Sequence, residues 1–113
     1  MYGFDLGQIV YWIELDRADG TACSVTVRSA RFHTARHNGG TVCVVNDSGQ
    51  CEFLSGKPTL FANNEEADTF ALGAAMRRII NFGYRVVTII DHRGKVWEVT
   101  AASVKMIEKG AQP

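Results

Sequence analysis

The sequence predicts an α+β fold in which a strongly bent antiparallel β-sheet, or a partly open barrel, packs against one main α-helix, with a C-terminal β-hairpin. Three observations carry this prediction. Apolar residues alternate with polar ones as far as Phe61, a helical spacing of apolar residues follows Asn63, and two short apolar runs close the chain. The chain has 113 residues, 46% of them hydrophobic. We therefore expect residues 1–113 to form a single α+β domain.

The first predicted strand begins in the stretch QIVYWIEL. Its odd positions are apolar and form the expected core face: Ile9, Tyr11, Ile13 and Leu15. Trp12 shares the other face with Glu14. We therefore expect the indole of Trp12 to lie at a sheet surface or under a second layer. We also expect either Trp12 or Phe70 to be partly exposed in the monomer and covered in an assembly.

A second, long strand is predicted from Ala22 to Phe32, after a turn at Asp19-Gly20. Its inward positions begin as odd numbers: Cys23, Val25 and Val27. The apolar phase then moves to even numbers at Ala30 and Phe32. This slip predicts a bulge or bend near Ser29, of the kind that curls a sheet toward a barrel.

Three shorter strands are expected over 41–45, 50–54 and 59–61, the first two joined by a turn at Asn46–Gly49. From GQIVYWIE to the short strand before LFANNEEA, the chain resembles small SH3-like or Tudor-like barrels capped by a helix. The resemblance covers about half of the chain and rests on the strand pattern. It implies a binding module, because such barrels present grooves and seldom perform chemistry.

The helix is predicted to begin at the cap Asn63, with Glu66 three residues on, and to end at Gly83. One stripe of apolar residues recurs at helical spacing and should face the sheet: Ala71, Leu72, Ala75, Met76, Ile79 and Phe82. Phe70 and Ile80 lie off this stripe. With Trp12 they are the candidate interface residues.

The last predicted hairpin joins strands over 84–91 and 95–100, and 103–107 is a further short strand. Its turn brings together Asp91, His92 and Arg93, an acid, a base and a cation. A small enzyme centred on these residues is one alternative function. No nucleophile elbow, phosphate-binding glycine loop or paired carboxylates accompany them.

The strongest local charge asymmetry is basic and lies between Arg28 and His37, although 12 basic and 12 acidic residues cancel over the whole chain. The candidate binding residues are Arg28, Arg31, His33, Arg36 and His37. Such a strand and loop predict phosphate contacts, so nucleic-acid binding is the first alternative function, ahead of the small enzyme. An edge strand protected by charge would carry the same residues.

The sequence excludes more than it assigns. It carries no cofactor motif, an odd number of cysteines without metal-ligand spacing, and no segment suited to cross a membrane, so we expect no cofactor, no metal and a cytoplasmic location. The main prediction is a non-enzymatic binding module for a protein partner or for itself as a homodimer. The chain resembles, in its length and style, short orphan proteins of phages and other mobile elements.

Overall fold

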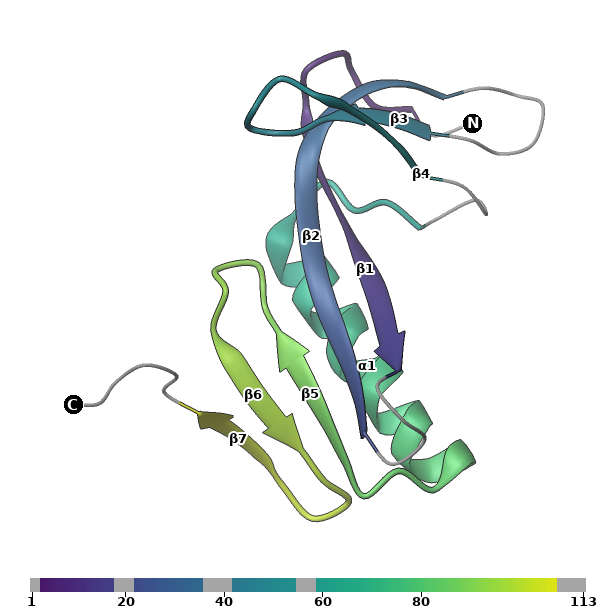
Figure 1. Ribbon diagram of the computed structural model, residues 1–113, viewed down its shortest axis with the longest axis vertical. Helices are drawn as coiled ribbons and strands as arrows, with labels where there is room; N and C mark the ends of the chain where they lie inside the picture. The colour runs from purple at the N-terminus through teal and green to yellow at the C-terminus, as the bar shows by residue number, and fades with distance from the viewer. Residues whose placement is uncertain (1–2, 18–21, 36–41, 55–58, 108–113) are drawn as a thin grey trace.

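The structure, a computed structural model, describes residues 3–17, 22–35, 42–54 and 59–107. Seven strands and one helix occur in this part of the chain (Figure 1). They are β1 (Ile9–Arg17), β2 (Ala22–Ala35), β3 (Val42–Val45), β4 (Cys51–Leu54), α1 (Asn64–Phe82), β5 (Val86–Ile90), β6 (Val96–Val99) and β7 (Val104–Ile107). The predicted α+β class is confirmed, and the sheet is not closed into a barrel.

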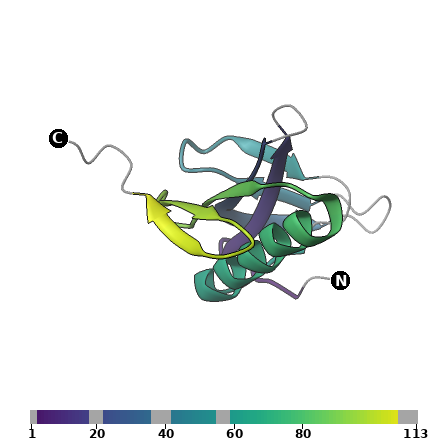
Figure 2. The same cartoon turned by 90° about the horizontal axis from the view of Figure 1, so that it is seen from below.

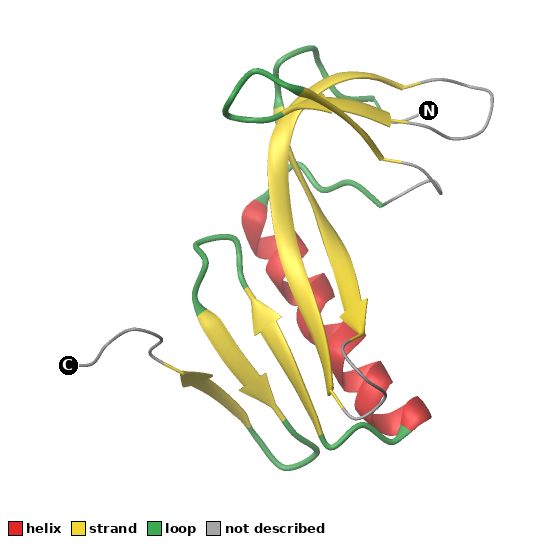
Figure 3. Ribbon diagram, in the orientation of Figure 1, coloured by secondary structure: helices red, strands yellow, loops and turns green. Residues whose placement is uncertain are grey.

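Strand β2 is the centre of the sheet. One of its edges pairs antiparallel with β1, while the other edge is divided between β5, beside residues 22–26, and β3, beside residues 31–35. Strand β4 pairs with β3, and β6 and β7 continue outward from β5 (Figure 1). The β2–β5 pair is parallel, which corrects the predicted all-antiparallel sheet. The reason is that α1 carries the chain back along the sheet before β5 begins (Figure 3).

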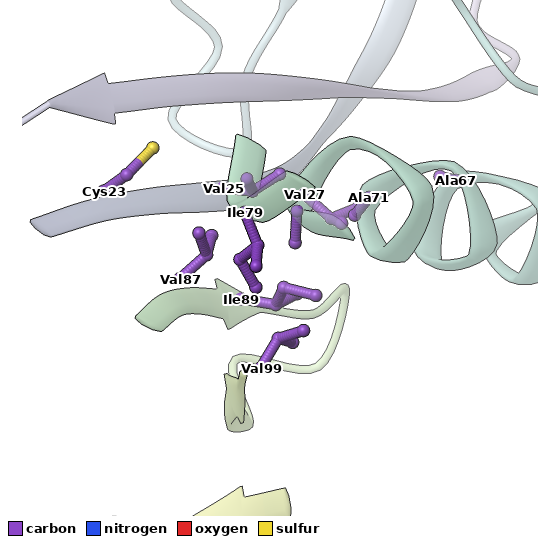
Figure 4. Close-up of a cluster of buried hydrophobic side chains, with 10 residues drawn as sticks. Cys23, Val25, Val27, Ala67, Ala71, Ile79, Val87, Ile89 and Val99 are labelled. Carbon is purple, nitrogen blue, oxygen red and sulfur yellow. The ribbon is translucent and has the colours of Figure 1, made fainter. Parts of the chain in front are cut away.

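The molecule has two hydrophobic clusters, on opposite faces of β1 and β2. The first lies beneath α1 (Figure 4) and contains Cys23, Val25, Val27, Ala67, Ala71, Ala75, Ile79, Val87, Ile89 and Val99. The second lies beneath the β3–β4 hairpin and contains Val10, Trp12, Ala30, Phe32, Val42, Val44 and Leu54. Figure 2 shows α1 and the β3–β4 hairpin on opposite sides of β1.

Two predictions about the first strands need correction for the same reason. The pairing of β1 with β2 runs unbroken past Ser29, and the register shift lies instead between Phe32 and Thr34, against β3. The apolar phase of β2 changes because its two halves bury opposite faces. Trp12 lies under a second layer, the β3–β4 hairpin, which was one of its two expected places. It is 2% exposed and offers no surface to a partner, so of the two candidates for partial exposure only Phe70 is partly exposed. Ile9, on the expected core face, is exposed.

The helix is fixed by local capping, as predicted. The side chain of Asn63 accepts a hydrogen bond from the backbone N–H of Glu66 at 3.0 Å, and Gly83 takes the left-handed conformation with φ of 76°. Alanines at 67, 71 and 75 are fully buried, and such small side chains let the helix lie close to the sheet. Phe82, expected in the buried stripe, is 66% exposed, with Arg78 over its ring.

The helix covers only part of its face of the sheet. It packs against β1, β2, β5 and β6, and not against β7. Apolar side chains nevertheless continue across this face to the outermost strand, because paired residues share a face. One cross-strand row is Val25, Ile89, Trp97 and Met106, and the next is Cys23, Val87, Val99 and Val104. Within the described residues, no helix combines the length and apolar character needed to cross a bilayer.

Candidate binding groove

A groove of about 270 Å³ lies between α1 and strands β5, β6 and β7. The helix contributes Asp68, Thr69 and Leu72 to its lining. The other lining residues are Ile89 from β5, Asp91 and Arg93 from the following turn, Trp97 from β6 and Val104 from β7. The groove therefore has an apolar floor and a charged rim at the end nearest the β5–β6 turn.

Asp91 holds that turn and the floor of the groove together. Its Oδ1 accepts hydrogen bonds from the backbone N–H groups of Arg93 at 2.9 Å and Lys95 at 3.0 Å, and its Oδ2 accepts from Nε1 of Trp97 at 3.0 Å. Burial raises the pKa of Asp91, but these hydrogen bonds, with the charge of Arg93, lower the pKa more, so the net shift is downward. The side chain is 6% exposed and is an ionised structural acceptor.

His92 connects the β5–β6 turn to the first turns of α1 through hydrogen bonds. Its Nδ1 donates to Oδ2 of Asp68 at 2.6 Å, and its backbone N–H donates to Oδ1 of Asp68 at 3.2 Å. Its Nε2 accepts from the side-chain amide of Asn64 at 3.1 Å, and the ring of Tyr11 meets the imidazole edge-on. Both imidazole nitrogens are thus engaged within the protein, which fixes the spacing between α1 and the turn.

The outer wall of the groove belongs to β7, the last strand of the sheet. Val104 is 48% exposed and Met106 is 37% exposed, and both lie on the face that carries Trp97. On the opposite face, the row that runs outward from Ser24 is polar and continues through Thr88 and Glu98 to Lys105. The edge strand therefore shows an apolar side toward the groove and a charged side away from it.

The structure does not bring the predicted basic residues together into one site. Arg28 contacts two carboxylates, Glu14 at 2.9 Å and Glu52 at 3.6 Å, and its guanidinium lies over the ring of Trp12. Arg31 lies three residues further along the same strand and so points to the opposite face. His33 is exposed, while Arg36 and His37 lie outside the described residues.

The basic residues of α1 and of the β5–β6 region are also dispersed. Arg77 lies over the ring of Phe70, and Arg78 lies over that of Phe82. Arg85 precedes β5, whereas Arg93 follows it at the other end.

The remaining two interface candidates lie on α1 and are not among the residues that line the groove. Phe70 is half-buried against Phe61, with ring centroids 5.1 Å apart, and the two line a second hollow of about 500 Å³ with Glu65, Glu66, Asn63 and Thr69. Ile80 is 73% exposed. Exposed apolar surface therefore occurs at both the groove and the helix end.

Sequence reasoning singled out Asp91, His92 and Arg93 but missed Asp68, Leu72 and Val104. The only available signal for Val104 was the alternation in Ser103–Ile107, which predicts a strand without showing that it is an edge. Among the described residues, no three His, Cys, Asp or Glu side chains are grouped to hold a metal ion.

Comparisons with known proteins add no assignment. No protein-family model, curated protein or solved structure significantly matches this chain.

Proposed function

We propose that the protein is a non-enzymatic binding module that takes a segment of a protein partner into the groove between α1 and β6–β7. The proposal rests on one observation: the apolar rows of the sheet continue onto β7, where α1 does not cover them. An apolar floor with a few fixed polar groups at its rim is the usual form of a ligand site. Here the rim is held in place by Asp91 and His92, so the groove exists before a partner arrives.

The same contacts favour binding over catalysis. A general base needs a nitrogen or oxygen aimed at its substrate, and the imidazole of His92 meets Asp68 and Asn64 at its two nitrogens. Asp91 is occupied by three donors. Thr69 supplies the one hydroxyl in the described lining, and the two carboxylates of that lining, Asp68 and Asp91, are hydrogen-bonded to His92 and Trp97. The enzyme alternative therefore has less support than the binding module.

Nucleic-acid binding also has less support. Arg28 is paired with Glu14 and Glu52, and a cation with two carboxylate partners adds little to phosphate attraction. Arg31 and Arg28 point away from each other. A cytoplasmic location remains our expectation; it is supported by the thiols of Cys23 and Cys51, which suit a reducing compartment.

A displayed library of random peptides tests the proposal. Peptides selected on the wild-type protein should be lost on Val104→Lys, which places a charge on the groove wall at a half-exposed position. They should be retained on Ile80→Lys, a matched change at the exposed end of α1. Unchanged circular dichroism confirms that both variants fold. The proposal is contradicted if peptide binding is unchanged by Val104→Lys or is lost on Ile80→Lys. It is also contradicted if no peptide is selected.

A further inference from the structure

The main chain of β7 presents a set of hydrogen-bonding groups at the edge of the sheet. The backbone N–H of Thr100 donates to the carbonyl of Ser103 at 2.8 Å, which makes these two residues a hydrogen-bonded pair. Bonded and non-bonded pairs alternate along an antiparallel ladder, so Glu98 and Lys105 are bonded to each other. Val104 and Met106 lie at non-bonded positions. Their N–H and C=O groups therefore point away from β6, and no described strand pairs with them.

The side chains of β7 set a matching chemical pattern. Val104 and Met106 end the two apolar rows on the groove side, and Lys105 ends the polar row on the other side, beyond Glu98. No ion pair joins Lys105 or Arg93 to another residue in the described part of the chain. A strand added at this edge would continue each row by one residue. It would put apolar side chains beside Val104 and Met106 and an acidic side chain beside Lys105.

We propose that β7 binds an extended peptide that adds an antiparallel strand to the sheet and carries an apolar, acidic, apolar triplet. This inference rests on the proposed function and names the partner that binds along the outer wall of the same groove. The two apolar residues bond to the main chain of Val104 and Met106 and turn their side chains toward Trp97. The acidic residue sits opposite Lys105, on the side of the sheet away from the groove. Main-chain bonds of this kind supply affinity, and alternate side chains supply specificity.

A second copy of the chain fits this edge less well. A symmetric pair of β7 strands that used both Val104 and Met106 would place Lys105 directly opposite Lys105 of the second copy. Like charges at that position destabilise a pair of strands, and lysine on an edge strand is a known guard against self-pairing. The strand is also only 4 residues long, whereas stable interfaces bury roughly 1,200–2,000 Å².

The charge preference is tested with three capped synthetic peptides whose centres are Val-Asp-Val, Val-Ser-Val and Val-Lys-Val. Fluorescence anisotropy should show that the wild-type protein binds the Asp peptide about tenfold more tightly than the Lys peptide. Lys105→Glu should reverse this order. Arg77→Glu, which makes the same change in charge on the exposed side of α1, should leave the order unchanged.

The strand geometry is tested with N-methylated versions of the Val-Asp-Val peptide. Methyl groups on the two valine nitrogens remove the N–H groups that face β7 and should abolish binding. A methyl group on the aspartate nitrogen points away from β7 and should be tolerated. If methylation of the valine nitrogens and methylation of the aspartate nitrogen weaken binding equally, strand addition is overturned. It is also overturned if the three peptides bind with the same affinity. A dimer in light scattering that Lys105→Glu disrupts would assign the edge to a second copy and also overturn it.

These results are separable from the proposed function. If peptide binding is lost on Val104→Lys but does not change with peptide charge or N-methylation, only the added strand is refuted. The binding module itself is refuted by the outcomes of the library experiment, none of which depends on peptide charge or methylation.

Discussion

Replacement of Asp91 by asparagine should lower the free energy of unfolding by about 2 kcal/mol, because a hydrogen bond to a charged group contributes about 1.5–3 kcal/mol. The asparagine carbonyl can still accept from the backbone N–H groups of Arg93 and Lys95. Its amide group, however, takes the place of Oδ2 and faces Nε1 of Trp97, which also donates. For a chain of this length, the loss corresponds to a fall of about 8 °C in Tm.

Thermal unfolding followed by circular dichroism measures this change, and Trp97→Phe supplies the control. The phenylalanine ring has no N–H. In the Trp97→Phe background, Asp91→Asn should therefore lower the free energy of unfolding by less than half as much as in the wild-type background. The difference is the coupling energy of a double-mutant cycle. An equal cost in the two backgrounds would refute the assigned role of the Asp91–Trp97 bond, and so would an unchanged Tm in the wild-type background.

The wild-type protein and Asp91→Asn also give a pH test. The pKa of Asp91 is lower in the folded state than its ordinary value of 3.8. Its stabilising effect is therefore fully present above pH 3.8 and is lost as the pH falls through the folded pKa. The wild-type protein should be more stable than Asp91→Asn at neutral pH, and the gap should narrow in acid. A gap that widened below pH 3.8 would have the wrong sign.

Three further changes probe the frame around the groove. Asn63→Ala should cost about 1 kcal/mol in urea unfolding, because it removes the cap on the N–H of Glu66; no change would refute that cap. Asp68→Asn should cost about 1 kcal/mol by the same measurement, because the bond to His92 loses its charged acceptor; a neutral effect would mean that this contact does not fasten the turn. Arg28→Ala should cost less than about 1 kcal/mol, because its ion pairs are half-exposed, and high salt should shrink the cost further.

Local signals were enough to predict some elements. The helix is set by its two ends, since Asn63 caps it and Gly83 takes a conformation that other residues adopt at a cost. The turn that follows β5 is set by Asp91 and Gly94, which lie within a few residues of each other. Such features depend on neighbours in the chain, so the sequence contains them directly.

The errors concern contacts between distant residues. Alternation divided β1 into two faces, but both faces are partly buried, and the sequence does not show that a hairpin from 42–54 covers Trp12. The groove depends on Asp68 meeting His92, 24 positions apart, and on β5 lying beside β2. Exposure of Val104 and Met106 follows from the place of β7 at the sheet edge, which strand pattern alone does not reveal.

Hydrogen exchange at the backbone amides of Val104 and Met106 tests the central claim most directly. In the free protein these two amides should exchange quickly, while the amide of Lys105, bonded to β6, is protected. Addition of a groove-binding peptide should protect Val104 and Met106 and leave the exposed end of α1 near Ile80 unchanged. If protection instead appeared at the helix end, or if the two edge amides stayed fast in the complex, the groove and its edge strand would not be the binding surface.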